Sequence, residues 1–285
     1  MTYVNSDALI DTETLSRLMN APDVRVVDAT WFLPNVDRSG RKEYEACHIP
    51  GAVYFDIDEI CDSDTKLPHM LPSPEKFSSR VRKLGLGDGN RIVVYDSNGG
   101  CMAAHRVWWT FRVFGHEDVA VLNGGLKKWI DEGRPTDDTE PMRRERHFTA
   151  RVDHSLVRTF DQMLANAESR REQVADARSR GRFDGTAPEP RSGLKSGHIP
   201  GSVSLPLNEL LDTGNNYTMR SADDIKAALD RAGINPKKPL VATCGSGVWA
   251  CSVAFALYLL GHDRVAVYDG SWTEWGGRED APVEV

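Results

Sequence analysis

The chain has 285 residues, 40% of them hydrophobic, and a formal net charge of -7 at pH 7. This is enough for two ordinary globular domains, and an acidic chain without a basic stripe repels a phosphate backbone, so nucleic acid is not an expected partner. No apolar run approaches the roughly 20 residues of a membrane span. Because the first residues also lack the pattern of a targeting segment, the sequence predicts a cytoplasmic protein without a membrane partner.

The cysteines are odd in number and show neither a CxxC pair nor a Cys/His spacing typical of zinc ligands. They are Cys47, Cys61, Cys101, Cys244 and Cys251. This pattern argues against a disulfide framework and against a metal site. Most of the thiols are therefore expected to be buried, and a cysteine in an unusual local setting is a candidate for chemistry.

The first half of the chain alternates short β-branched runs with helix-like segments. Strands are predicted at RVVDAT (25–30), RIVVYD (91–96) and VAVLNG (119–124), and a helix at FSSRVRKLG (77–85). The strands are nearly continuous in apolar character. Such strands alternating with helices predict a parallel sheet with helices on both faces.

The segment that follows, residues 132–153, contains two prolines and dense mixed charge without an apolar period. These features are typical of an inter-domain linker. We therefore divide the chain into an N-terminal domain at 1–135, a linker at 136–155 and a C-terminal domain at 156–285.

The second half repeats the first. HIPG occurs at 48–51 and again 150 residues later, and IVVYD (92–96) corresponds to LVATC (240–244) at an offset of 148. A helix is predicted at SADDIKAALDRAG (221–233), with Ser221 as its N-cap. The sequence thus predicts an α/β protein made of two copies of one small doubly wound domain. In such sheets ligands bind beyond the carboxyl ends of the strands.

Cys244 ends the predicted strand PLVATC and is followed by the loop GSGVW (245–249) and an apolar helix. Glycines at 245 and 247 allow the backbone to curl so that successive N–H groups point inward. Together with the helix dipole, these groups form a cradle for an anion, which stabilises a thiolate nucleophile. The alternative is an inert core thiol beside an ordinary turn between strand and helix.

Comparison of the two copies favours the catalytic interpretation. Asp96 stands in the first copy where Cys244 stands in the second, so one domain is expected to be active and the other to support it. Thiolates in such loops cleave phosphate esters or transfer sulfur. Phosphate chemistry needs an arginine six positions after the cysteine, where this chain has Ala250. Sulfur transfer needs only amides that stabilise a persulfide anion, with no metal or organic cofactor.

Along nearly its whole length the sequence resembles the two-domain rhodanese family of sulfurtransferases, and within it the 3-mercaptopyruvate sulfurtransferase branch. The resemblance rests on both HIPG motifs, RVWW (106–109), GRFDGTAPEPR (181–191), CGSGV (244–248) and DGSWTEW (269–275). It implies two tandem rhodanese-like domains, of which the C-terminal one is catalytic. It also implies that the active site lies in the cleft between them.

The residues after the cysteine bear on the sulfur donor. Thiosulfate-using relatives typically carry two basic residues there, whereas this chain has the neutral Gly245 and Ser246, which favours a singly charged donor. The resemblance assigns Arg182 and Arg191 to the carboxylate of 3-mercaptopyruvate. The alternative for each arginine is a surface ion pair.

The resemblance further implies a linked triad of side chains, Asp58, His69 and Ser246. Such a triad polarises the carbonyl of the donor and handles the proton as pyruvate enolate leaves. The alternatives are structural: Asp58 as an acid at a helix start, His69 as a capping or packed loop histidine, and Ser246 as a turn residue.

Trp249 departs from the branch, which usually has threonine at this position. Its large ring narrows the pocket or forms a new wall for the acceptor, and with Gly245, Gly247 and Val248 it is expected to border the substrate. The predicted reaction moves sulfur from 3-mercaptopyruvate through a Cys244 persulfide to thioredoxin, a low-molecular-weight thiol or cyanide. A thiosulfate sulfurtransferase and a persulfide carrier without turnover are the alternatives.

Overall fold

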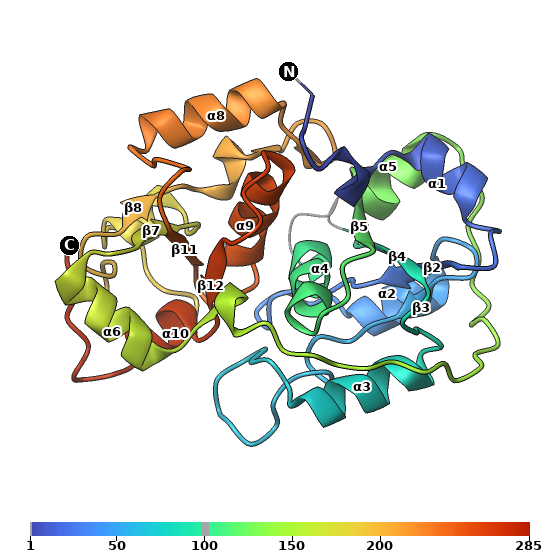
Figure 1. Cartoon of the computed structure of the whole chain (residues 1–285), viewed down its shortest axis with the longest axis horizontal. Helices are drawn as coiled ribbons and strands as arrows, with labels where there is room; N and C mark the ends of the chain where they lie inside the picture. The colour runs from blue at the N-terminus through green and yellow to red at the C-terminus, as the bar shows by residue number, and fades with distance from the viewer. Residues whose placement is uncertain (1, 98–102) are drawn as a thin grey trace.

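The computed structural model describes residues 2–97 and 103–285, and its strands form two five-stranded sheets and one short pair (Figure 1). The N-terminal sheet contains β1 (Leu9–Ile10), β2 (Val24–Asp28), β3 (Val53–Tyr54), β4 (Arg91–Tyr95) and β5 (Val119–Leu122). The C-terminal sheet contains β6 (Val157–Arg158), β7 (Gln173–Asp176), β8 (Val203–Ser204), β11 (Leu240–Thr243) and β12 (Ala266–Tyr268). The short antiparallel pair is β9 (Leu211–Asp212) and β10 (Thr218–Met219).

Helices connect these strands in both domains. The N-terminal helices are α1 (Thr12–Leu18), α2 (Gly40–Ala46), α3 (Pro74–Lys83), α4 (Ala103–Val113) and α5 (Gly125–Asp131). The C-terminal helices are α6 (Phe160–Ser169), α7 (Arg180–Phe183), α8 (Ala222–Arg231), α9 (Ala250–Leu259) and α10 (Ser271–Trp275). The predicted cap of α8 is confirmed, because the side chain of Ser221 accepts a hydrogen bond from the amide of Asp224.

The two large sheets have the same topology. Their strand orders are β1-β5-β4-β2-β3 and β6-β12-β11-β7-β8, which correspond strand by strand. All described pairs within them are parallel. Asp96 follows β4 and Cys244 follows the equivalent β11, so the two residues correspond as predicted. Cys101 and the other residues of 98–102 lie outside the described residues. The predicted duplicated α/β fold is confirmed.

Each sheet buries apolar side chains on both faces, so helices are needed on both. One face of the N-terminal sheet is covered by α1, α2 and α5, which contribute Leu15, Tyr44 and Trp129 to its core. One face of the C-terminal sheet is covered by α6 and α10, with Phe160 and Trp272. The other two faces, covered by α3, α4, α8 and α9, share a single hydrophobic cluster that runs through both domains.

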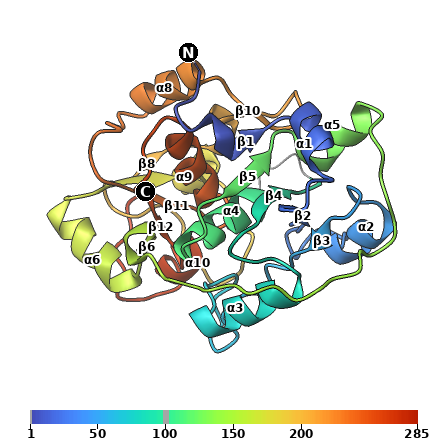
Figure 2. The same ribbon diagram turned by 45° about the vertical axis from the view of Figure 1, so that its right-hand side comes forward.

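The two domains meet where α4 packs against α9 (Figures 1 and 2). The ring of His105 stacks on Phe255 at a centroid distance of 4.6 Å, and its Nδ1 lies 2.8 Å from Ser252 Oγ. Trp108 packs edge-on against the same phenylalanine. Burial lowers the pKa of His105 to about 3, so the imidazole is neutral in this interface at pH 7.

The charged segment between the domains lies along the N-terminal domain. Phe148 is buried and meets Phe77 of α3 at a centroid distance of 5.5 Å, and the carbonyl of His147 accepts a hydrogen bond from Asp88. His48 and Asp137 exchange both of their backbone hydrogen bonds. The predicted linker is therefore held by packing, although its limits at 136 and 155 remain a prediction.

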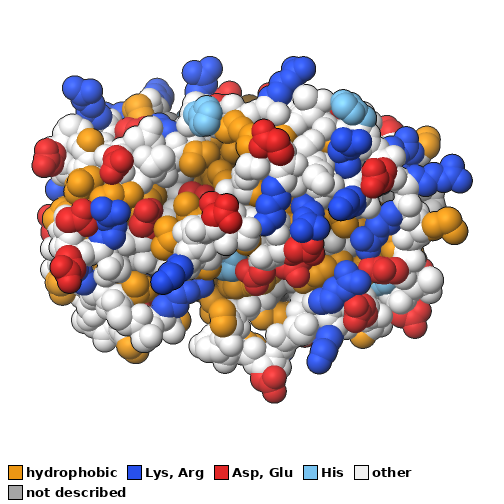
Figure 3. Space-filling view, turned by 90° about the horizontal axis from the view of Figure 1, so that it is seen from below, with side chains coloured by type: hydrophobic (Ala, Val, Ile, Leu, Met, Phe, Trp, Pro, Cys, Tyr) orange, Lys and Arg blue, Asp and Glu red, His pale blue; other side chains and the backbone are white. Residues whose placement is uncertain are grey.

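The described helices are short, and the surface carries charges of both signs (Figure 3). None of the described helices is long and apolar enough to cross a membrane. Over the face drawn in Figure 3, acidic side chains lie among the basic ones.

Candidate active site

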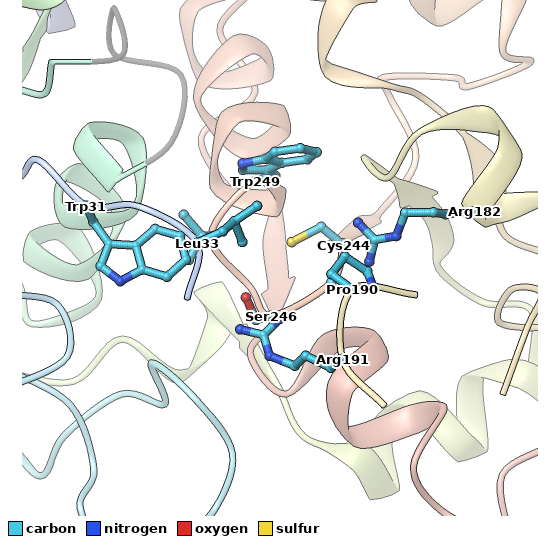
Figure 4. Close-up of a pocket in the computed structure, with 10 residues that line it drawn as sticks. Trp31, Leu33, Arg182, Pro190, Arg191, Cys244, Ser246 and Trp249 are labelled. Carbon is cyan, nitrogen blue, oxygen red and sulfur yellow. The ribbon is translucent and has the colours of Figure 1, made fainter. Parts of the chain in front are cut away.

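Cys244 lies at the carboxyl end of β11, and the loop 245–249 leads from it into α9. Gly247 has φ +77°, and a Cβ at this position would lie 2.6 Å from the carbonyl oxygen of Asp269, so only glycine fits the turn. Cys244 is 2% exposed, yet its Sγ points into a pocket (Figure 4). The thiol is therefore sheltered from bulk water but faces a cavity.

The backbone amides of this loop are available to a ligand. Among the described residues, no acceptor is found for the N–H groups of residues 245–249. Free amides in a tight loop at the start of a helix are the arrangement that binds an anion. The cradle predicted from the glycine spacing is thus compatible with the observed geometry.

A cavity of about 40 Å³ opens at Cys244 and has walls from both domains (Figure 4). By this measure it has room for roughly three water molecules. The lining residues are Trp31, Leu33, Arg182, Pro190, Arg191, Cys244, Gly245, Ser246, Val248 and Trp249. All the predicted loop residues except Gly247 line it, and Trp249 stands across from the arginines.

Arg182 belongs to α7 and is fixed by a buried carboxylate. Its Nη2 lies 2.6 Å from Glu189 Oε2, and the other oxygen of Glu189 lies 2.8 Å from Arg178 Nη1. Arg178 is fully buried, pairs with Asp176 at 2.6 Å and lies over the ring of Trp272. The guanidinium of Arg182 therefore reaches the pocket from a rigid base. A Cβ at position 245 would lie 3.0 Å from it, so glycine there leaves room for this arginine.

Arg191 is half-buried in the same wall of the pocket, but unlike Arg182 it is not held by any described carboxylate. Among the described residues it has no hydrogen bond or ion pair, so its charge is free to meet a ligand. Burial lowers the pKa of Arg191, and Cys244, Arg182 and Asp58 all lie close enough to act on its charge. An arginine remains protonated at pH 7 despite such a shift. Arg191 is therefore a cation beside the thiol that has no ion-pair partner among the described residues, although Asp58 and Glu189 act on its charge.

Asp58 and His69 come together on the N-terminal side of the pocket. Asp58 Oδ1 lies 2.8 Å from His69 Nδ1, an ion-pair distance, although the angle is poor for a hydrogen bond. The other carboxylate oxygen accepts a hydrogen bond of 2.7 Å from the indole of Trp31. Burial raises the pKa of Asp58, but the neighbouring His69 and Trp31 outweigh it and hold the pKa below the ordinary value.

The histidine itself is unusual. His69 is 5% exposed, and its backbone has φ +60°, a left-handed conformation that is uncommon for a residue with a side chain. Its Nε2 is buried without a hydrogen-bond partner among the described residues. Ser246 lines the pocket, but within the described part of the chain no hydrogen bond joins it to His69. Two members of the predicted triad thus meet, and among the described residues no hydrogen bond joins the third to them.

The interaction of Asp58 with His69 leads us to expect a pH-dependent contribution to the free energy of unfolding. Because the pKa of Asp58 is lower in the folded chain than its ordinary 3.8, the carboxylate stabilises the fold above that pH, and this contribution is lost as the pH falls through the lowered pKa. The side chain is 57% exposed, so the effect is small, below about 1 kcal/mol. Urea unfolding from pH 7 to pH 3 should show a shallower loss of stability in Asp58→Asn than in the wild type.

Several residues at the site were not singled out from the sequence. Trp31 and Leu33 follow β2, and their only signal was their place beyond the carboxyl end of a predicted strand. Glu189 and Thr273 stand inside motifs that were recognised as a whole, and so does Arg106 in RVWW. A sequence motif identifies such residues but does not show which distant segment each side chain contacts.

Comparisons with known proteins agree with this architecture. The rhodanese-like domain family matches residues 11–132 and 159–278. The mouse 3-mercaptopyruvate sulfurtransferase is 42% identical over 273 residues, covering 94% of this chain and 91% of the relative. The bovine thiosulfate sulfurtransferase is 45% identical over 285 residues, covering 97% and 94%. The chain belongs to the rhodanese family of sulfurtransferases, with two tandem rhodanese-like domains.

A solved structure shows the same fold. SseA from Escherichia coli, described as a 3-mercaptopyruvate sulfotransferase with the rhodanese fold, has a TM-score of 0.84 and 34% sequence identity. The match covers 93% of this chain and 98% of SseA. The relatives carry two different donor names, so family membership alone leaves the sulfur donor of this enzyme open.

Proposed function

We propose that this sulfurtransferase takes sulfur from 3-mercaptopyruvate. The thiolate of Cys244 attacks the sulfur of the donor, and a new S–S bond forms as the C–S bond of the donor breaks. The electron pair leaves on carbon as pyruvate enolate, which takes up a proton to give pyruvate. The Cys244 persulfide then passes its outer sulfur to an acceptor thiolate, and the Cys244 thiolate is regenerated.

The charge of the pocket wall carries this proposal. In the wall from the C-terminal domain, Arg178 and Arg182 are paired with Asp176 and Glu189, whereas Arg191 has no ion pair among the described residues. Asp58, in the N-terminal wall, acts on the charge of Arg191 but is itself bonded to Trp31 and close to His69. Arg191 lies beside the thiol. One free guanidinium matches one carboxylate, with two parallel hydrogen bonds available. Thiosulfate, a dianion, would be left with one unpaired charge.

The remaining wall supports an organic donor. Leu33, Pro190, Val248 and Trp249 present apolar surface to the cavity, which suits the carbon skeleton of 3-mercaptopyruvate better than a fully polar anion. In this proposal the backbone amides of the loop from Gly245 to Val248, which includes Gly247, supply the cradle, and Trp249 bounds the donor.

The contacts of His69 support a part in proton transfer. Asp58 fixes one ring nitrogen, and Nε2 is left buried and unpaired for a ligand. We assign to Asp58 and His69 the positioning of a proton for the departing enolate. Ser246 reaches the donor from the loop and completes the triad with Asp58 and His69 only when substrate is bound.

The proposed persulfide chemistry also indicates the sulfur acceptor and the cellular compartment. A persulfide on Cys244 is open to attack by a thiol such as that of thioredoxin or a low-molecular-weight thiol, or by cyanide, and no cofactor is needed to carry the sulfur. The described cysteines, Cys47, Cys61, Cys244 and Cys251, are all free thiols, which favours a reducing compartment. We propose the cytoplasm.

The test compares donors. We expect kcat/KM with 3-mercaptopyruvate, followed by pyruvate release, to exceed that with thiosulfate. Arg191→Met should raise KM for 3-mercaptopyruvate about 10- to 100-fold, because a charge-assisted hydrogen bond is lost. Arg180→Met, an exposed arginine of α7 outside the pocket lining, is the matched control and should behave as the wild type. A preference for thiosulfate would contradict the proposal.

Thiosulfate sulfurtransfer is the second candidate, because the bovine relative with that name is 45% identical. The donor comparison separates the two reactions directly. A third candidate, a persulfide carrier without turnover, is favoured by the narrow cavity beside Trp249. Mass spectrometry would then find one extra sulfur atom on Cys244 but no release of pyruvate over repeated cycles with a small donor.

A further inference from the structure

The carbonyl groups of the Cys244 loop are held on the side away from the pocket. The carbonyl of Cys244 accepts a hydrogen bond of 3.0 Å from the amide of Trp272. The carbonyl of Gly245 accepts two hydrogen bonds from Thr273, one of 2.8 Å from its amide and one of 2.6 Å from its hydroxyl. Both donors lie in the first turn of α10, which therefore anchors the beginning of the loop.

The next anchor reaches the loop from both domains. The carbonyl of Gly247 accepts a hydrogen bond of 3.1 Å from the thiol of Cys251, in α9. It also accepts one of 3.4 Å from the guanidinium of Arg106, in α4 of the N-terminal domain. That guanidinium is buried, pairs with Asp269 at 2.7 Å and donates to the carbonyl of His69. One arginine thus connects the loop to the strained histidine.

The positions of these carbonyls determine where the amides point. In a planar trans peptide the C=O of one residue and the N–H of the next point in opposite directions. Holding the carbonyls of residues 244, 245 and 247 outward therefore directs the N–H groups of Gly245, Ser246 and Val248 to the opposite side. These amides have no acceptor among the described residues, and Cys244 Sγ lies on the pocket side.

We propose that Thr273 is a positioning residue for sulfur transfer. Its hydroxyl adds a second bond to the carbonyl of Gly245 and so fixes the peptide whose N–H, on Ser246, is directed to the opposite side from that carbonyl. The hydroxyl thereby stabilises the thiolate and the persulfide without touching either. The inference rests on the proposed function only in naming the persulfide as the anion that is held.

The test replaces the hydroxyl alone. In Thr273→Val the shape is kept and one hydrogen bond is lost, so kcat should fall about fivefold while KM changes little. The pH profile for alkylation of Cys244 by iodoacetamide, followed by mass spectrometry of its peptide, should move to higher pH. Thr273→Ser, which keeps the hydroxyl, should restore both properties to those of the wild type.

The control is Ser202→Ala, which removes a buried hydroxyl bonded to the carbonyl of Ile199 in the same domain but outside the pocket lining. It should lower Tm without moving the alkylation profile. An unmoved profile in Thr273→Val, or a Thr273→Ser variant as impaired as Thr273→Val, would overturn the inference. The wild type could transfer sulfur from neither donor while its alkylation profile still differs from that of Thr273→Val. The proposed function would then fail, and the positioning role of Thr273 would stand.

Discussion

Cys244→Ser is expected to abolish sulfur transfer from every donor, with a loss of more than about a thousandfold in kcat. A serine hydroxyl at this position is not ionised at pH 7 and forms no persulfide, so the step that breaks the C–S bond of the donor has no nucleophile. The measurement is release of pyruvate from 3-mercaptopyruvate, together with the intact mass after exposure to the donor. The variant should gain no sulfur on residue 244.

The matched control is Cys47→Ser, which changes a free thiol of the N-terminal domain outside the pocket lining. It should retain the activity of the wild type and take up one sulfur atom on Cys244. Thermal unfolding of both variants verifies that each is folded. Substantial turnover in Cys244→Ser would refute the persulfide mechanism whichever donor is used.

Arg106→Met should lower the free energy of unfolding by about 3–5 kcal/mol, because removing one partner of a buried ion pair leaves the other charge uncompensated. The side chains of Arg106 and Asp269 are 3% and 5% exposed, and among the described residues the amide of Leu71 is then the donor that remains to the carboxylate. Urea unfolding, with the midpoint and the slope determined together, measures the loss.

Two further variants identify the cause. Arg112→Met removes another arginine of α4, whose guanidinium lies 4.1 Å from the ring of Tyr258, and should cost only about 1 kcal/mol. Arg106→Met combined with Asp269→Leu should regain part of the lost stability, because the unpaired carboxylate is gone. Equal losses for Arg106→Met and Arg112→Met would show that the ion pair is not the source of the effect.

The fold could be predicted closely from the sequence because each strand and helix has a local signature. The run PLVATC ends one residue beyond the observed end of β11, and Ser221 caps α8 as expected. The helix predicted from Phe77 begins earlier, at Pro74, since Ser73 caps it and proline is favoured in a first helical turn. The apolar period alone does not reveal that start.

The site was predicted less completely. The chemistry of Cys244 follows from residues adjacent in sequence, and the resemblance added Arg182 and Arg191, which both line the pocket. The pairing of Arg106 with Asp269 joins segments from different domains, so no local pattern contains it. Whether a hydrogen bond forms between Ser246 and His69 also depends on how the domains pack, and no local pattern in the sequence contains that information.

The hydrophobic cluster common to both domains limits how the enzyme can work. Since α4 and α9 are sealed together by His105, Trp108 and Phe255, the halves cannot swing apart without exposing that core to water. In the proposed mechanism, donor and acceptor therefore react in succession at one thiol that stays fixed between the domains, and the persulfide carries the sulfur from the first reaction to the second.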